Sequence, residues 1–187
     1  MAEASREPHR PSMRNELVDR TLELARTGQT VSLDSAARAA GMTKAGVLYH
    51  FRTKEALVAA VLDHLLDGYE QELSTFAQTR AGDQAAPTQR LSAYIDWAFD
   101  GEFGHADLLM FIDPNLRDAL SERWRTRISS WVAVPETLPV ATRARLHSAR
   151  LIADGHWFNT ASNGVALPPQ DKAAIRRLAH DLTKEPS

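Results

Sequence analysis

Apolar residues recur along this chain at intervals of three and four positions, the spacing that places side chains on one face of an α-helix. The longest such series is Val58, Leu62, Leu65, Tyr69, Leu73 and Phe76. Nowhere does an alternating run of Val, Ile and Thr stand between turn residues, as a half-buried strand requires. We therefore predict an all-α chain of about nine helices, which glycine, proline and short polar stretches separate.

Three short helices are predicted first. Ser12, Ser32 and Thr43 are their expected N-caps, because a hydroxyl oxygen can accept from the free N–H groups of a first helical turn. Gly28 and Gly41 are expected to end the first two helices, since glycine adopts the left-handed conformation common at helix ends. The expected helices span about 13–27, 33–40 and 44–51.

A longer helix is predicted from Thr53 onward, with Glu55 in its first turn, where the helix dipole favours a carboxylate. Some 25 residues at about 1.5 Å each make a rod of roughly 37 Å, long enough to bridge two lobes. The polar stretch "TRAGDQAAPTQ" at 79–89 is predicted to be a loop or hinge. Further helices are expected at about 88–101, 105–112, 115–131, 142–162 and 171–184.

Composition narrows the class of protein. The 187 residues include no cysteine, which excludes a disulfide framework, thiol catalysis and cysteine-based zinc sites. No stretch approaches the ~20 apolar residues of a membrane span. The first eleven residues, "MAEASREPHRP", lack the apolar segment of a signal peptide. We expect a cytoplasmic protein without membrane contact, in which residues 1–11 form a disordered arm.

Charge is distributed unevenly between the two ends of the chain. Residues 1–56 hold nine Lys and Arg against seven Asp and Glu, a net +2, and residues 57–187 hold thirteen against seventeen, a net −4. This small asymmetry permits nucleic-acid binding by the first third of the chain but does not require it.

Two short helices joined by a tight turn at Gly41 have the proportions of a helix-turn-helix. A rotation of 100° per residue places Val47 on the core side of the later helix and Ala45 and Tyr49 opposite it. Lys44 flanks this outer face, and such a face can enter a DNA major groove, where small residues permit close approach and the lysine can reach a guanine edge or a phosphate.

Taken one at a time, these residues have plainer interpretations. Lys44 and Lys54 fit ordinary solvated charges, His50 fits a packing histidine at a helix end, and Tyr49 fits a surface aromatic residue. Their joint spacing, between a helix of small residues and a long amphipathic helix, favours the DNA-binding interpretation.

The segment "AAGMTKAGVLYHFRTKEAL" resembles the DNA-binding domain of TetR-family transcriptional regulators, and the resemblance extends over about 17–66. It implies a dimeric repressor with a helix-turn-helix domain at 12–57 and an effector-binding and dimerisation domain at 58–187. It also implies that Lys44, Ala45 and Gly46 approach the bases and that Tyr49, His50 and Lys54 contact the DNA backbone. The predicted DNA-binding residues are Ser32, Thr43, Lys44, Ala45, Gly46, Tyr49, His50 and Lys54.

Two positions depart from the pattern of that family. Leu48 stands where many members have a tyrosine, so one usual phosphate contact is missing. Arg52 replaces a common proline and adds a possible phosphate partner. The base preference is therefore open.

The last two predicted helices carry apolar stripes that suit a dimer interface, because a helix-turn-helix protein reads two half-sites about one helical turn apart. The alternative is that these stripes only complete the core of one subunit. The predicted interface residues are Ala149, Ile152, Ala153, Ile175, Leu178 and Leu182. Nearby, "LIADGHWF" resembles a segment in the C-terminal domains of one TetR subgroup.

The central helices are rich in large rings, which suit an apolar pocket with a few polar groups. Plain core packing is the alternative for each ring. The predicted effector is a small apolar or aromatic molecule, and the predicted ligand-binding residues are Trp97, Phe111, Trp124 and Trp157. The polar candidates beside them are His105, Asp107, Asp154, His156 and Asn159.

Enzyme and metal chemistry find little support. His147 and Asp154 are two helical turns apart, about 10 Å, which is too far for one ion. No Ser-His-Asp grouping, phosphate loop or dinucleotide fingerprint is present, so we predict no catalysis, cofactor or metal. The competing hypothesis to a regulator is a helical small-molecule-binding or protein-interaction module whose helix-turn-helix no longer functions.

Overall fold

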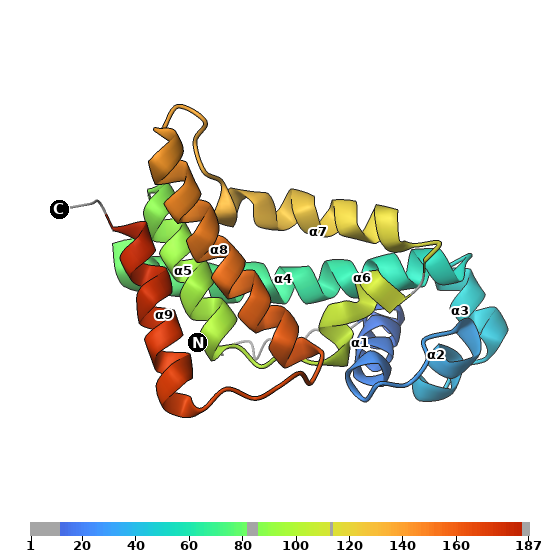
Figure 1. Cartoon of the computed structure of the whole chain (residues 1–187). Coiled ribbons are helices and arrows are strands. Elements are labelled where there is room, and N and C mark those ends of the chain that lie inside the picture. Colours follow the sequence, from blue (N-terminus) through green and yellow to red (C-terminus); the bar gives the residue numbers. More distant parts are fainter. Residues whose placement is uncertain (1–11, 82–85, 113, 185–187) are drawn as a thin grey trace, which may run out of the picture. The chain divides into compact units, whose positions relative to one another are not determined.

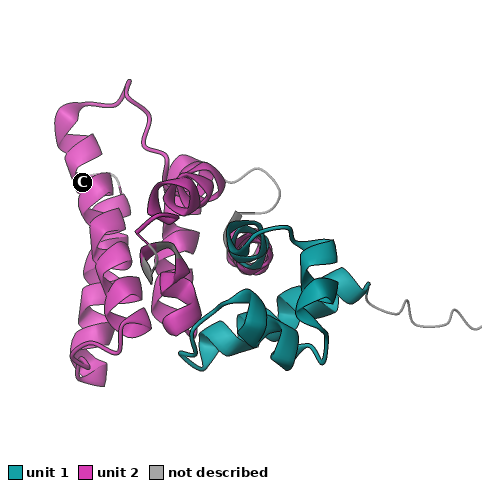
Figure 2. Ribbon diagram, turned by 90° about the vertical axis from the view of Figure 1, so that its right-hand side faces the viewer, with its two compact units in different colours: residues 1–61 teal, residues 62–187 magenta. Residues whose placement is uncertain are grey.

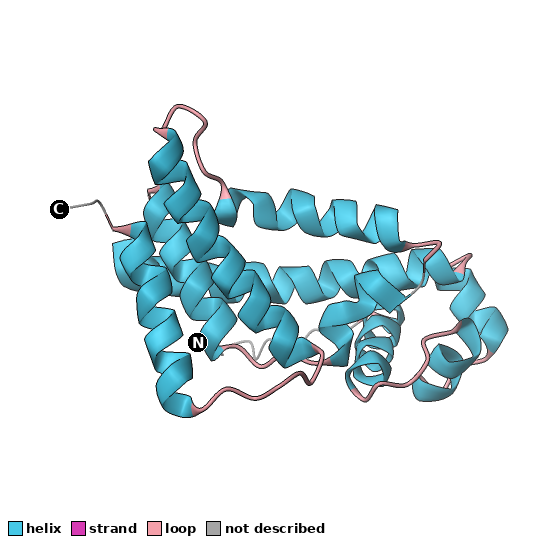
Figure 3. Ribbon diagram, viewed as in Figure 1, coloured by secondary structure: helices cyan, strands magenta, loops and turns pink. Residues whose placement is uncertain are grey.

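The computed structural model describes residues 12–81, 86–112 and 114–184, and every regular element within them is helical (Figure 3). The predicted arm at 1–11 lies outside the described residues. The elements are α1 (Met13–Arg26), α2 (Leu33–Ala39), α3 (Lys44–His50), α4 (Lys54–Ala81), α5 (Pro87–Asp100), the 3-10 helix η2 (His105–Leu108), α6 (Leu109–Ile112), α7 (Arg117–Val132), α8 (Val140–Ala161) and α9 (Pro169–Thr183). The all-helical prediction is confirmed.

The chain forms two compact units, residues 1–61 and 62–187 (Figure 2). This division lies four residues beyond the predicted domain boundary at Leu57. The helix α4 is continuous through it, so its first turns belong to the first unit and the rest to the second. None of the helices in the described ranges is long and apolar enough to cross a membrane.

The start and stop signals of the first unit are confirmed. Thr43 Oγ1 accepts from the backbone N–H of Gly46 at 3.1 Å, and Ser12 and Ser32 cap α1 and α2 in the same way. Gly28 and Gly41 have φ angles of 72° and 63°. Both angles lie in the left-handed region that side chains with a Cβ disfavour, which is why the chain can turn sharply at these points.

The helix α4 is longer than predicted. The predicted loop began at Thr79, but the helix continues to Ala81, and α5 begins at Pro87. The prediction was wrong at these positions because Thr79, Arg80 and Ala81 all fit a helix interior. Proline fits at the first position of α5, where its missing N–H would have no helical partner.

In the second unit, α5, α8 and α9 lie side by side (Figure 1). The helix α5 is buried over most of its surface, as the run of buried residues from Tyr94 to Phe99 indicates. The inward face of α8 includes three alanines, whose small size lets neighbouring helices approach closely. That face consists of Leu146, Ala149, Ala153, Trp157 and Ala161.

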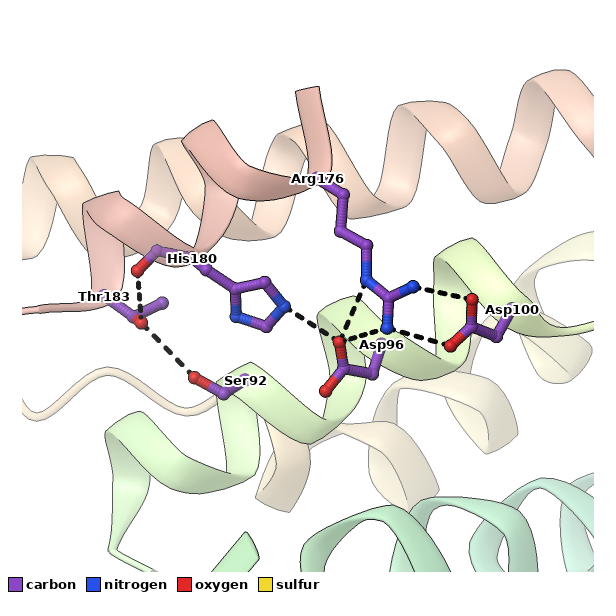
Figure 4. Close-up of polar contacts among 6 residues, drawn as sticks. All are labelled: Ser92, Asp96, Asp100, Arg176, His180 and Thr183. Carbon is purple, nitrogen blue, oxygen red and sulfur yellow. Dashed lines mark hydrogen bonds and ion pairs between the residues drawn. The ribbon is translucent and has the colours of Figure 1, made fainter. Parts of the chain in front are cut away.

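Polar contacts hold α9 against α5 (Figure 4). The Asp96 carboxylate of α5 is buried and accepts from both Arg176 and His180 of α9. One turn to the N-terminal side, the Ser92 hydroxyl lies 3.3 Å from that of Thr183. These contacts fix the position of α9 along α5, since a buried carboxylate needs its partners in place.

Arginines of α7 reach acidic residues of α4, beside which α7 runs (Figure 1). Arg123 Nη1 donates to Asp63 at 2.9 Å, and Arg127 Nη2 donates to Asp67 at 2.7 Å and to Glu70 at 2.6 Å. The hydrogen bonds with Glu70 and then Asp67 raise the pKa of Arg127 above its already high ordinary value, so this side chain stays charged. The helix α7 is thus joined to α4 by a row of ion pairs.

Candidate nucleic-acid interface

The core of the first unit positions α3. Val47 is fully buried, as the sequence predicts, and Phe51 is nearly so. The Arg14 guanidinium lies 4.7 Å from the centre of the Phe51 ring, a distance at which a cation is attracted to the face of an aromatic ring. On α2, the side chains packed inward are Ala36 and Ala37, and their small size lets α2 and α3 lie close together.

The opposite face of α3 is open to solvent. Tyr49 is 85% exposed, and its ring makes an edge contact with the His50 ring at 5.2 Å. Lys44 and Ala45 are also exposed, and Gly46 and His50 are partly exposed. Five of the predicted DNA-binding residues therefore lie on or beside one exposed face, which carries a cation, an aromatic hydroxyl and little apolar bulk.

Lys44 is paired within its own unit. Its Nζ donates to Asp34 Oδ2 of α2 at 3.0 Å, and both side chains are more than half exposed. Such a surface pair is weak, because water and salt screen it. The lysine therefore has an acidic neighbour with which a DNA phosphate or base edge would compete.

The other predicted residues occupy caps and helix starts. The hydroxyls of Ser32 and Ser35 cap each other's backbone N–H groups, at 3.0 and 2.9 Å, so the Ser32 side chain is engaged within the protein. Thr43 is exposed, and its oxygen accepts from Gly46. Lys54 is half-buried as the first residue of α4. Thr43 and Lys54 thus lie at the two ends of the α3 segment and Ser32 at the start of α2.

The predicted ligand-binding rings lie in the second unit, and three of the four belong to one cluster. Trp124 lies 5.1 Å from Trp157 and 5.9 Å from Tyr69, which lies 4.9 Å from Trp97. Phe103 contacts three of these rings, and we call these five residues the ring cluster. Its members come from α4, α5, α7, α8 and the segment after α5.

The fourth predicted ring is outside that cluster. Phe111 is about half exposed and contacts Phe158 at 6.2 Å. Phe158 is itself exposed and reaches the cluster only through an outlying contact with Trp157, at 6.4 Å. Phe111 is therefore at the periphery.

The polar candidates are mostly engaged with other protein groups. Asp154 accepts from Tyr94 Oη at 2.8 Å, and burial raises the pKa of Asp154. Asn159 donates to the Val165 carbonyl at 3.0 Å. Burial, with a smaller effect of Lys172, lowers the pKa of His156. Asp154 and Asn159 thus make hydrogen bonds within the protomer, whereas the buried Nδ1 of His156 has no hydrogen-bond partner among the described residues. Within the described ranges, no three His, Asp or Glu side chains gather in a way that could hold a metal ion.

The predicted interface residues fall into three groups by exposure. Ala149 and Ala153 are fully buried inside the protomer. Leu178 is exposed. Half-buried positions complete the set: Ile152, Ile175 and Leu182.

Comparison with known proteins identifies the first unit. Residues 24–61 match the family described as "Bacterial regulatory proteins, tetR family". The match ends within the first turns of α4 and includes all of α2 and α3, the part of the chain that carries the exposed recognition face. By this match, the helix-turn-helix segment of the chain is a TetR-family DNA-binding domain.

Two solved structures show that the fold extends over the whole chain. The multidrug binding protein EbrR, solved in complex with imidazole, is 16% identical with a TM-score of 0.62, over 95% of this chain and 98% of that one. AmtR from Mycobacterium smegmatis is 19% identical with a TM-score of 0.54, over 97% and 90%. At such identity the likeness establishes the fold alone. No curated protein sequence matches the chain.

The helix-turn-helix and its match to a family of bacterial regulatory proteins support a role in DNA-binding transcriptional regulation. Sequence reasoning did not include three residues in the candidate sites. Leu151 and Phe158 are exposed apolar residues of α8, and Tyr69 was assigned only to the core stripe of α4. The large side chains of Leu151 and Phe158, seven positions apart, were the available signal for an outward-facing stripe.

Proposed function

We propose that this TetR-family protein is a repressor that binds its operator as a homodimer and is released by a small apolar or aromatic effector. The observation that supports the proposal best is the exposed face of α3, where Tyr49 projects into solvent beside Lys44 and Ala45. A DNA-binding regulator acts where the DNA is, so we place the protein in the cytoplasm.

In this proposal α3 enters the major groove. Lys44, Ala45 and Gly46 approach base edges, because they are small or end in a donor that guanine accepts. Tyr49 and His50 contact phosphates, which position the helix but carry no sequence information. Thr43 and Lys54 add phosphate contacts at either side of α3. Ser32 caps α2, and the N-terminus of that helix approaches the DNA backbone.

Two copies are required because each copy presents one α3 to one half-site, and half-sites are about 34–36 Å apart. We propose that the outward stripe of α8, with Leu151 and Phe158, forms the centre of the interface together with Leu178 of α9, since all three are exposed apolar residues. Ile152, Ile175 and Leu182 would lie at its edge.

Effector binding would act through α4, because this helix continues from the first unit into the second. The spacing of the two half-sites on DNA is fixed. A ligand that favours a conformation in which the two α3 helices of the dimer are separated by another distance would therefore prevent both from docking at once. A difference in affinity of a few kcal/mol between the two conformations is enough to shift the population.

Selection of genomic DNA fragments that the protein retains, including the DNA upstream of its own gene, tests the proposal. We expect retained fragments to compete in gel shifts, with an affinity that falls steeply as salt is raised, because counterions are released from phosphates. Lys54→Ala should weaken binding to every sequence, and Lys44→Ala should also change base preference. Arg26→Ala is the matched control, an exposed cation at the end of α1.

If no fragment is retained, the helix-turn-helix is not functional and the alternative, a helical small-molecule-binding or protein-interaction module, holds. If fragments are retained but both lysine variants bind like the original protein, the assignment of contacts on α3 is wrong.

The interface is tested by sedimentation of Leu178→Glu and Phe158→Glu. Each places a charge in the centre of the proposed interface, so we expect the mass to fall to that of one chain. Val165→Glu is the control, since Val165 is exposed in the segment between α8 and α9. An unchanged dimer mass in both interface variants would place the interface elsewhere.

A further inference from the structure

Two buried polar atoms of the ring cluster have no hydrogen-bond partner among the residues that the structure describes. Tyr69 and Trp157 are 5% and 6% exposed, and within these residues neither the Tyr69 hydroxyl nor the Trp157 indole nitrogen meets a donor or acceptor. Both rings contact Trp124, Tyr69 from α4 and Trp157 from α8. Buried polar groups are generally paired, so an unpaired one indicates a missing partner or a functional role.

Residues of the same types in the same unit are paired. The Trp97 indole nitrogen donates to Glu72 Oε2 at 2.8 Å, and Tyr94 Oη donates to Asp154 Oδ1 at 2.8 Å. Trp97 belongs to the ring cluster itself. Among the buried tyrosine and tryptophan side chains of this unit, the unpaired atoms are therefore those of Tyr69 and Trp157. Leaving them unpaired costs free energy that a bound partner would recover.

The chemistry of the two atoms restricts that partner. An indole nitrogen can only donate, and a tyrosine hydroxyl can donate or accept, so a partner that serves both needs an acceptor. The surrounding rings favour a flat aromatic molecule, which can stack on them or meet their edges.

A cation is a poor fit to the same place. It would meet the positive end of the indole N–H, and the nearby carboxylates are already engaged: Glu72 accepts from Trp97, and Glu70 and Asp67 accept from Arg127. A cation–π contact with these rings would therefore lack the anionic partner that usually strengthens it.

We propose that the effector is a planar, uncharged aromatic molecule with a hydrogen-bond acceptor, which the Trp157 indole nitrogen binds directly and the Tyr69 hydroxyl supports. This inference rests on the proposed function and specifies its ligand. Because Tyr69 is a residue of α4, the ligand would contact the helix that leads to the DNA-binding unit.

Three molecules of nearly equal shape test this class: naphthalene has no acceptor, quinoline has a ring-nitrogen acceptor, and N-methylquinolinium is a cation. Titration is followed by calorimetry and by the indole signals in ¹H–¹⁵N NMR spectra. We expect quinoline to bind about tenfold tighter than naphthalene, the contribution of one hydrogen bond, and tighter than N-methylquinolinium. The Trp157 indole proton should move downfield with quinoline, the direction expected when an N–H donates a hydrogen bond, and should move less or in the opposite direction with naphthalene, which acts on it through its ring current alone.

Trp157→Phe should remove the advantage of quinoline over naphthalene, and Tyr69→Phe should reduce it. Trp131→Phe is the matched control, since Trp131 lies at the end of α7 and outside the ring cluster. Circular dichroism checks that each variant is folded. If Trp157→Phe does not fold, the shift of the Trp157 signal in the unsubstituted protein decides the question.

Three outcomes would overturn the inference: equal affinity for naphthalene and quinoline, tightest binding of N-methylquinolinium, or no binding of any of the three. In the last case the Tyr69 hydroxyl and the Trp157 indole nitrogen are paired with water. These measurements need no DNA. Retention of genomic fragments without recognition of quinoline would leave the regulator intact and refute its ligand class. Recognition of quinoline without DNA retention would refute the regulator alone.

Discussion

Asp96 of α5 and Arg176 of α9 share two hydrogen bonds to one carboxylate oxygen, with Oδ1 at 2.6 Å from Arg176 Nη2 and 3.1 Å from Nε. The same arginine extends to Asp100, and His180 also reaches Asp96 Oδ1, at 2.8 Å. Asp96 is only 3% exposed, so its charge is compensated by α9 rather than by water. The position of α9, which carries part of the proposed dimer interface, is therefore set in part by this buried ion pair.

Arg176→Met is expected to destabilise the protein by about 3–5 kcal/mol, because it leaves the Asp96 carboxylate buried with a partner removed. Urea unfolding followed by circular dichroism measures this loss. Lys184→Met is the control: its ion pair with Asp181 is largely exposed and such pairs contribute at most about 1 kcal/mol. A loss below 1 kcal/mol in Arg176→Met would mean that water or His180 compensates Asp96 without the arginine.

Asp34→Asn is expected to strengthen operator binding about two- to fivefold, the range that a surface ion pair of up to about 1 kcal/mol can supply. The substitution frees Lys44 from its acidic neighbour. Glu23→Gln is the control. It removes one negative charge from the same unit, at a glutamate that pairs with Arg26 rather than with Lys44, so it reports the general effect of charge on DNA binding. Equal affinities of the two variants in gel shifts would show that the Lys44–Asp34 pair has no specific role.

Gly46→Ala separates folding from DNA binding. An added Cβ would lie 3.3 Å from Met42 Cε, the mobile end of a flexible side chain, and alanine is favoured over glycine in a helix by about 1 kcal/mol. We expect unchanged or higher thermal stability together with weaker operator binding, because the backbone of α3 could no longer approach the bases as closely. Gly68→Ala in α4, whose Cβ would meet open space, should raise stability without changing operator affinity.

The first unit could be predicted closely because its signals are local. Ser12, Ser32 and Thr43 cap helices that begin immediately after them, and Gly28 and Gly41 adopt the conformation that only glycine takes easily. Each of these effects depends on residues within a few positions in the chain.

The faces of α8 were harder to predict because both of its sides carry apolar residues. Small residues such as Ala149 and Ala153 point into the protomer, and the larger Leu151 and Phe158 point outward. Which face is buried depends on how closely α5 and α9 pack against it, and helical spacing alone does not contain that information.

The pairing of polar groups was also beyond the sequence. Lys44 and Asp34 are ten positions apart on different helices, and Tyr69 and Trp157 join one cluster from helices far apart in the chain. Helical periodicity places such side chains on a face. The tertiary structure decides which of them find partners.

Stability is expected to fall between about pH 7.5 and pH 5.5, in part because of His156. Burial, and then the charge of Lys172, lower its pKa below the ordinary value of 6.5, so the unfolded chain binds a proton at a higher pH than the folded protein. The stabilising contribution is therefore present above pH 6.5 and is lost as the pH falls through that value toward the lower pKa of the folded state.

His156→Phe removes this titration while keeping an aromatic ring against Phe99, on which the imidazole stacks at 4.2 Å. We expect the melting temperature of the variant to fall less than that of the original protein over the same pH interval. His147→Gln, on the exposed side of the same helix, is the control and should follow the original protein. If the melting temperatures of His156→Phe and of the original protein fall by the same amount, the acid sensitivity arises from other groups. His156 would then bind protons equally well in the folded and the unfolded protein.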